Sequence, residues 1–230
     1  MDPQNLPAVL LETRARMARA AAAAGRSAQS VTLLAVGKAQ PVALLAAAAD
    51  CGVADFGESY LQEALAKVAA LQDRALTWHF IGRIQANKTR AIAETFAWVH
   101  ALDRPKIAAR LAVQRPPQAP PLNVCLEVNI AGEPGKGGVG AAELPALAAA
   151  VARLPRLALR GLMCIPPEET EPARQRAWFA RLRGLRDDLN AAGYSLDTLS
   201  MGMSGDFESA IREGATIVRL GTVLFGARPR

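Results

Sequence analysis

The order of apolar and alanine-rich segments most constrains how this 230-residue chain can fold. Eight short apolar runs alternate with longer helix-compatible segments, a pattern typical of parallel βα units. The expected strands cover residues 31–37, 53–56, 78–81, 98–101, 122–128, 159–164, 198–200 and 216–220. The expected helices between them cover residues 41–51, 59–72, 86–96, 104–113, 141–154, 172–192 and 205–213.

Eight such units predict the α/β class and a single (β/α)8 TIM-type barrel with an extra N-terminal helix over residues 6–24. The chain length is close to that of one barrel, so residues 1–230 are expected to form one domain. A doubly wound open sheet is the alternative. Such sheets often have a Gly-rich turn after the first strand, whereas this strand ends in Val36-Gly37-Lys38.

The composition and the distribution of charge limit which partners and which cellular location we expect. Lysines and arginines exceed acidic residues, 27 against 21, but they are spread along the helices among acids, so nucleic acid is not a favoured partner. No apolar stretch is long and uncharged enough for a membrane span, and charges interrupt residues 6–24, unlike a signal peptide. We therefore expect a cytoplasmic protein. The three cysteines lack metal-ligand spacing, so no metal is expected.

Lys38 is the first candidate for a functional side chain, because active sites of such barrels lie at the C-terminal ends of the strands. It follows Leu34 and Val36 at a period of two, so it points into the barrel if they do. Desolvation lowers the pKa of a lysine, and a deprotonated amine can condense with an aldehyde to form a Schiff base. The alternative is a lysine that turns out to solvent.

Arg219 is the second candidate, since it lies among apolar neighbours and shares the parity of Ile217. A guanidinium in such a strand needs an acceptor, which is either a carboxylate from another strand or the ring nitrogen of a bound heterocycle. Arginine donates hydrogen bonds and accepts none. A pyridine nitrogen facing it therefore stays unprotonated, and the ring becomes a weaker electron sink.

Two segments near the end of the chain are candidates for phosphate binding, where barrels often place such a site. One is residues 200–206, a strand end with glycines, and the other is Gly221-Thr222 after the last strand. Glycines let backbone N–H groups approach a phosphate closely, and the hydroxyls of Ser200 and Thr222 can add donors.

Six segments in chain order carry a resemblance to a known family. They are Leu34-Ala-Val-Gly-Lys38, Phe56-Gly-Glu-Ser-Tyr-Leu-Gln-Glu63, Trp78-His-Phe-Ile-Gly-Arg-Ile-Gln-Ala-Asn-Lys88, Leu159-Arg-Gly-Leu-Met163, Leu199-Ser-Met-Gly-Met-Ser204, and Val218-Arg-Leu-Gly-Thr222 through Phe225-Gly-Ala-Arg228. With these segments the chain resembles the pyridoxal phosphate homeostasis protein family, whose fold resembles the N-terminal barrel domain of alanine racemase.

The resemblance implies pyridoxal 5′-phosphate as the cofactor and assigns a role to five residues. Lys38 is implied as the Schiff-base lysine, and Arg219 as the residue that faces the pyridine nitrogen. The phosphate is implied to lie on Ser200, Gly221 and Thr222.

Three further residues are candidates for the cofactor site from their places in the sequence. Met201, together with Met203, is expected to pack beside the ring. Asn87 is expected to reach the mouth of the site after the third strand, with the start of the next helix as the alternative. Three positions depart from the usual pattern of the family. Gly37 stands where a serine is usual, Ser59 where an asparagine is usual, and Arg83 where many members have proline.

The expected function follows from a missing partner for Lys38. Racemases need a second acid/base, which the resemblance implies is a tyrosine from a separate domain of the other subunit. Here Tyr60 and Tyr194 are expected at a helix start and in a loop. We therefore expect a non-enzymatic, monomeric protein that buffers pyridoxal phosphate and delivers it to apoenzymes.

Two other classes of function remain as alternatives. One is a low-activity amino acid racemase, and the other is a cofactor-free barrel enzyme for phosphate esters. The role of His79 also stays open between a catalytic base and a structural histidine, because strand parity does not place it.

Overall fold

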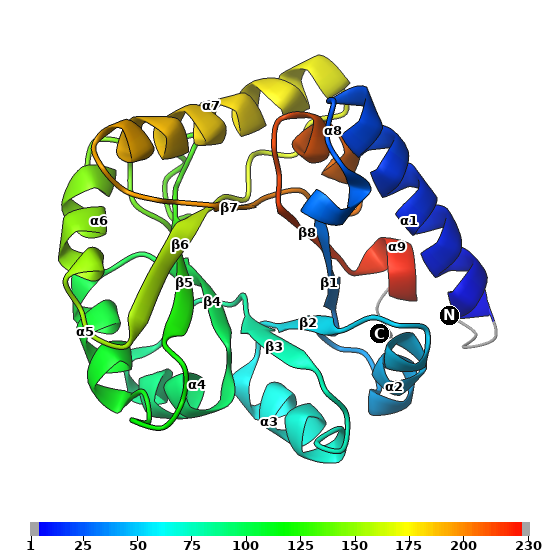
Figure 1. The fold of residues 1–230 in the computed structure, drawn as a ribbon, viewed down its shortest axis with the longest axis horizontal. Helices are drawn as coiled ribbons and strands as arrows, with labels where there is room; N and C mark the ends of the chain where they lie inside the picture. The colour runs from blue at the N-terminus through cyan, green and yellow to red at the C-terminus, as the bar shows by residue number, and fades with distance from the viewer. Residues whose placement is uncertain (1–4, 227–230) are drawn as a thin grey trace.

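The computed structural model describes residues 5–226 and contains a closed barrel of eight parallel strands in chain order (Figure 1). The strands are β1 (Thr32–Val36), β2 (Asp55–Glu58), β3 (Thr77–Phe80), β4 (Trp98–Leu102), β5 (Leu122–Glu127), β6 (Leu157–Met163), β7 (Thr198–Ser200) and β8 (Ile217–Leu220). Each expected strand overlaps an observed one, and the predicted (β/α)8 fold is confirmed.

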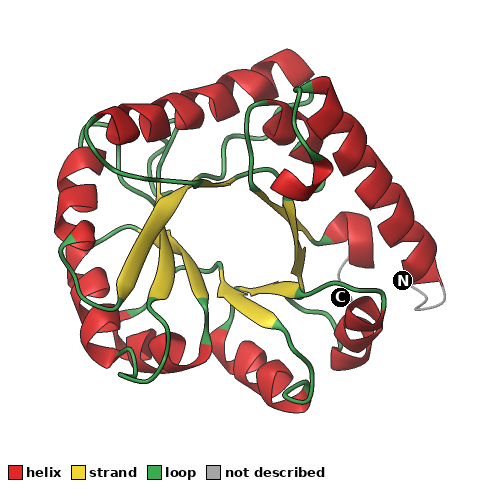
Figure 2. Ribbon diagram, viewed as in Figure 1, coloured by secondary structure: helices red, strands yellow, loops and turns green. Residues whose placement is uncertain are grey.

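Helices surround the strands on the outside of the barrel (Figure 2). They are α2 (Val42–Asp50), α3 (Leu61–Ala70), α4 (Thr89–Thr95), α5 (Pro105–Gln114), α6 (Leu144–Ala152), α7 (Pro172–Ala191), α8 (Phe207–Arg212) and α9 (Thr222–Phe225). The extra N-terminal helix α1 (Leu6–Ala23) packs against α8 and α9. The last resemblance segment ends at Arg228, which lies outside the described residues.

The main apolar core lies between the strands and the helices. On α5, for example, Ile107, Ala108 and Leu111 recur at helical spacing and are buried, and Pro105 occupies the first turn, where its missing N–H costs nothing. Large side chains such as Phe56 are fully buried, each stabilising the fold by roughly 1.5–3 kcal/mol.

The inside of the barrel differs from this outer core because it is partly polar. A small separate apolar cluster joins β4, β5 and β6 through Ala101, Cys125 and Met163. Four polar side chains, one each from β3, β4, β7 and β8, are also buried inside the barrel: His79, His100, Ser200 and Arg219. Buried polar groups need partners, so this part of the molecule is where bound chemistry is expected.

A β-bulge in β4 shapes the lumen. The residues Val99 and Leu102 pair with Val124 and Leu126 of β5, so β4 has one residue more than its partner over this stretch. Bulges redirect side chains, and this one lies at His100. In the part of the chain from residue 5 to residue 226, no helix is both long and apolar enough to cross a membrane.

Candidate functional site

Lys38 lies in a tight turn directly after β1. The N–H of Gln40 donates to the carbonyl of Gly37 at 2.9 Å, and Ala39 has a φ of 59°, in the left-handed region that a residue with a side chain rarely adopts. Such strain persists where the surroundings hold the backbone in place, and it concentrates at functional sites. Lys38 is half-buried, with its Nζ over the ring of Tyr60 at 5.3 Å from the centroid.

A buried ionic cluster holds this turn. Lys67 of α3 donates from Nζ to the carbonyl of Gly37 at 2.6 Å, to Glu58 at 2.8 Å and to Glu63 at 2.5 Å. Glu63 in turn accepts from the N–H of Ala39 at 2.7 Å. Both Lys67 and Glu58 are buried, and burial raises the pKa of Glu58 to about 6 despite the bond from Lys67. Sequence reasoning missed this cluster.

Arg219 is buried in β8 without a carboxylate partner among residues 5–226. Its Nη1 donates to the carbonyl and to the hydroxyl of Ser200, at 2.6 and 2.9 Å, and its Nη2 donates to the carbonyl of Cys164 at 2.9 Å. The described residues therefore do not form the alternative considered from the sequence, an ion pair between Arg219 and a carboxylate on another strand. A guanidinium has five N–H donors, so two remain beyond these three bonds.

One pocket at the C-terminal ends of the strands brings the main candidates together. Lys38, Arg219, Gly221 and Thr222 all line a pocket of about 330 Å³, a volume within the range of small-molecule sites. The other lining residues are Val36, Ser59, Ile81, Ile165, Met203, Ser204 and Gly205. Lys38 and Arg219 are the two titratable side chains in this lining, so the pocket suits an anion.

Ser200 does not line this pocket. It is fully buried, and its hydroxyl contacts Arg219 and His100. A different hydroxyl, that of Ser204, lines the pocket, and it accepts from the N–H of Val223 at 3.1 Å. This bond joins the loop after β7 to the start of α9.

Other candidates lie at varying distances from the pocket. Met201 is fully buried in the outer core, and the methionine in the lining is Met203. Asn87 is exposed in a short 3-10 helix, Ala86–Lys88, and is not part of the lining. Ser59, one of the departures from the family pattern, does line the pocket.

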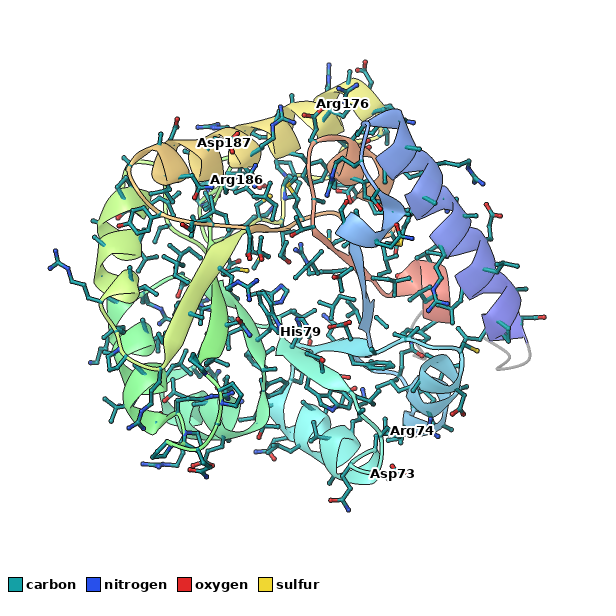
Figure 3. The ribbon with its side chains drawn as sticks, in the orientation of Figure 1. Asp73, Arg74, His79, Arg176, Arg186 and Asp187 are labelled. Carbon is teal, nitrogen blue, oxygen red and sulfur yellow. The ribbon has the colours of Figure 1, made fainter. Side chains whose placement is uncertain are left out.

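His79 lies inside the ring of strands rather than at the pocket (Figure 3). Its Nε2 is 3.0 Å from the carboxylate of Asp55, and its Nδ1 is 2.9 Å from Nε2 of His100. Burial lowers the pKa of His79 and lowers that of His100 well below its usual value. Sequence reasoning had not singled out His100.

The relatives of this chain identify its family. Residues 12–229 match the family described as "Alanine racemase, N-terminal domain". A protein of Pseudomonas aeruginosa named "Pyridoxal phosphate homeostasis protein" is 59% identical over 95% of this chain and 94% of its own length. This chain belongs to the pyridoxal phosphate homeostasis protein family.

Solved structures agree with the family. PipY of Synechococcus elongatus PCC7942, solved with PLP bound, has a TM-score of 0.79 and 38% sequence identity, covering 86% of this chain and 93% of PipY. The alanine racemase of Corynebacterium glutamicum has a TM-score of 0.69 at 18% identity, covering 98% of this chain and 62% of the racemase. At that identity the racemase shares the fold alone.

Proposed function

We propose that this protein holds pyridoxal 5′-phosphate reversibly on Lys38 and thereby buffers the cofactor for apoenzymes. The observation that carries the proposal is the single pocket that Lys38 shares with Arg219, Gly221 and Thr222. The cofactor presents an aldehyde, a ring nitrogen and a phosphate, and the pocket offers an amine, a guanidinium and a set of hydroxyl and glycine donors. The membership in the family and the PLP-bound relative support the same ligand.

Lys38 attaches the cofactor in this proposal. Its deprotonated Nζ attacks the aldehyde carbon, and loss of water leaves a C=N bond, which water can hydrolyse again. The ionic cluster of Lys67, Glu58 and Glu63 holds the backbone of the turn, so the amine is presented from a fixed place. Attachment is therefore reversible, and it takes place at a fixed position in the pocket.

Arg219 and the glycine-rich ends of two strands orient the ligand. The two N–H donors of Arg219 beyond its bonds to protein are available to the ring nitrogen, which then stays unprotonated. We assign the phosphate to Ser204, Gly221 and Thr222, because Ser204 and not Ser200 offers its hydroxyl to the pocket.

The pocket lining supports holding the cofactor rather than turning over an amino acid. Racemisation needs an acid/base on each face of the substrate carbon, and the described lining holds the amine of Lys38 but no imidazole, carboxyl, thiol or phenol group opposite it. Tyr60 lies against Lys38 rather than across the pocket from it. An unprotonated ring nitrogen also weakens carbanion stabilisation.

A labelling experiment tests the proposal. Purified protein titrated with pyridoxal 5′-phosphate should gain an imine absorbance band, and borohydride reduction followed by peptide mass spectrometry should place the label on Lys38. Lys38→Arg should abolish the covalent label. The matched control Lys106→Ala, which removes an exposed lysine from α5, should keep it.

Each contrary result has a distinct meaning. A protein that gains no band with added cofactor would refute the proposed function, whereas a band retained in Lys38→Arg would refute only the choice of lysine. Exchange of the α-proton of amino acids should not exceed the rate of the free cofactor. A faster rate that vanishes in Lys38→Arg would favour the racemase alternative.

A further inference from the structure

A chain of hydrogen bonds crosses the inside of the barrel from one end to the other. At its start, Asp55 of β2 lies 3.0 Å from Nε2 of His79 in β3, whose Nδ1 lies 2.9 Å from Nε2 of His100 in β4. The Nδ1 of His100 lies 2.7 Å from the hydroxyl of Ser200 in β7, which also accepts from Arg219 of β8 at 2.9 Å. We call these five side chains the lumen network.

The Asp55 carboxylate, together with two neutral imidazoles, determines the direction of the bonds in the lumen network. The carboxylate accepts from Nε2–H of His79, and a neutral His79 then accepts at Nδ1 from Nε2–H of His100. A neutral His100 in turn accepts at Nδ1 from the hydroxyl of Ser200, which itself accepts from Arg219. Both imidazoles are then protonated at Nε2.

The surroundings of the two histidines favour this single arrangement. His79, His100 and Ser200 are buried, and burial lowers the pKa of both imidazoles, which keeps one proton on each ring. The ring of Trp98 stacks on His79 with centroids 5.5 Å apart and 5° between the planes. With the rings held in place, the remaining freedom of the network is the position of its protons.

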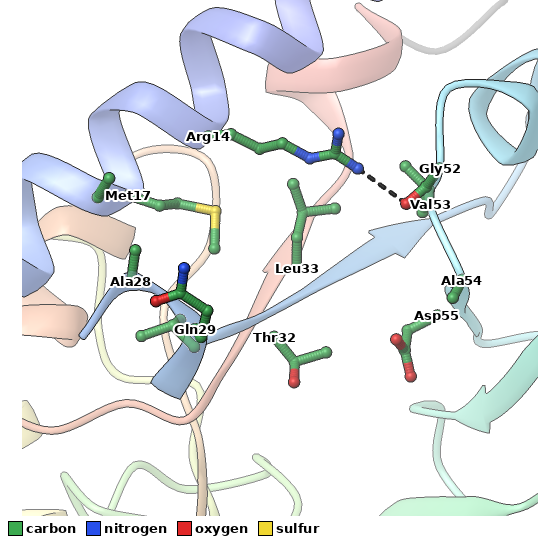
Figure 4. A pocket seen from close by; sticks show the side chains of 12 residues that line it. Arg14, Met17, Ala28, Gln29, Thr32, Leu33, Gly52, Val53, Ala54 and Asp55 are labelled. Carbon is green, nitrogen blue, oxygen red and sulfur yellow. Dashed lines mark hydrogen bonds between the residues drawn. The ribbon is translucent and has the colours of Figure 1, made fainter.

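The ends of the lumen network lie at opposite faces of the barrel. Arg219 lines the proposed cofactor pocket at the C-terminal face. Asp55 is the first residue of β2, and its side chain, 28% exposed, lines a separate pocket of about 380 Å³ between α1 and the start of β1 (Figure 4). A change at Asp55 can thus be made without touching the cofactor pocket.

We propose that Asp55, His79, His100 and Ser200 are positioning residues that hold the Arg219 guanidinium in the orientation that faces the cofactor ring. The inference rests on the proposed function, since it takes the ring nitrogen as the partner of Arg219. If a donor replaced the Asp55 carboxylate, His79 and then His100 would move their protons to Nδ1. Ser200 would then receive two donors, and its bond to Arg219 would weaken.

The tautomers can be observed directly in the protein without cofactor. The chain has two histidines, both in the lumen network, so ¹⁵N-histidine labelling gives two ring systems to assign by NMR. We expect both rings to be protonated at Nε2 near neutral pH. Asp55→Asn retains an oxygen acceptor and should keep this pattern, whereas Asp55→Lys supplies a donor and should move both protons to Nδ1. A wild-type ring protonated at Nδ1, or on both nitrogens, would overturn the inference.

Cofactor affinity then tests whether the network acts on Arg219. Asp55→Lys and Ser200→Ala should each weaken binding of pyridoxal 5′-phosphate about tenfold, the effect of one lost hydrogen bond to a charged group. Asp55→Asn should bind as the wild type does. So should Ser209→Ala, which removes a buried hydroxyl that bonds Gln175 outside the lumen. Asp55→Lys should add no further loss in a Ser200→Ala background, because the path is already broken.

The outcomes separate this inference from the proposed function. Reversed tautomers in Asp55→Lys with unchanged affinity would show that the network does not position Arg219. If the losses of affinity from Asp55→Lys and Ser200→Ala were additive in the double variant, that would also show that Asp55 does not act on Arg219 through Ser200. A wild-type protein that binds no cofactor would refute the proposed function, while the tautomers would still decide the direction of the network. If Asp55→Lys does not fold, wild-type tautomers and the affinity of Ser200→Ala carry the test.

Discussion

Glu58 is a buried carboxylate with one oxygen that has no hydrogen-bond partner. Its Oε1 accepts from Lys67, but Oε2 is buried without a partner among the described residues. A Cβ on Gly37 would lie 2.5 Å from Oε1, so the departure from the usual serine at this position leaves the space that Glu58 fills. A serine there would bring a hydroxyl to this carboxylate. The charge of Glu58 is therefore only partly compensated.

The raised pKa of Glu58 predicts a pH dependence of stability. Because the folded-state pKa is about 6 and the ordinary value is 4.5, the folded protein holds this proton more tightly, and stability falls as pH rises through that window. Glu58→Gln lacks this contribution. The free energy of unfolding of the wild type minus that of Glu58→Gln should fall by about 2 kcal/mol between a pH well below 4.5 and a pH above 6, measured by urea unfolding.

Other titrating groups also change stability with pH, and their effects can be separated from that of Glu58. The buried histidines have lowered pKa values and act in the opposite direction, but they are present in both proteins and cancel in the difference. Glu94→Gln removes a surface carboxylate from α4 and reports the effect of net charge alone. A difference between wild type and Glu58→Gln that is flat with pH would contradict the prediction.

The sequence alone identifies Lys38 and Arg219, because a charged residue at a strand end or within an apolar strand stands out without any knowledge of the three-dimensional structure. Ser200 looked equally suited to a phosphate, but the cross-barrel neighbours that occupy its hydroxyl are set by tertiary packing. His100 lies at a β-bulge, where strand parity cannot place a side chain. Lys67 did leave a signal, since it lies three residues after Ala64, on the buried face of α3.

At the scale of elements, alternation of apolar and helical segments predicted all eight strands, and the ends were less accurate. The second strand was expected over residues 53–56 and lies at Asp55–Glu58, because pairing with β1 and β3 extends it past the apolar run. The short helix α9 was not expected. Four residues are too few for a helical periodicity to be visible.

The turn from β7 into α8 depends on Gly202. It has a φ of 94°, and a Cβ there would lie 2.6 Å from the Cβ of Ala210. Gly202→Ala combines backbone strain with overpacking and should destabilise the protein by about 3 kcal/mol. Gly184→Ala is the matched control, because no atom lies within 4 Å of that Cβ inside α7, and it should stabilise by roughly 0.5–1 kcal/mol. Similar effects of both changes on urea unfolding would contradict this role of Gly202.

At the scale of the whole molecule, neighbouring strands of the barrel pair over unequal lengths. Strands β5 and β6 pair along almost their whole length, whereas β7 and β8 share a single register pair, Ser200 with Ile217. The residues proposed to contact the ligand lie on both sides of the junction between β7 and β8, which we call the β7–β8 seam, and in the turn after β1. A cofactor bound there would tie together the two neighbouring strands that share the fewest register pairs.

This arrangement predicts where cofactor binding rigidifies the protein. With pyridoxal 5′-phosphate at about 100 times its Kd, openings that break the site should become roughly a hundredfold rarer. Amide hydrogen exchange at short labelling times should therefore slow in residues 198–205 and 217–225 and change little in β5 and β6, whose residues do not line the pocket. Lys38→Arg with the same cofactor concentration should lose most of this protection. Protection spread evenly around the barrel would show that the ligand does not act at the β7–β8 seam.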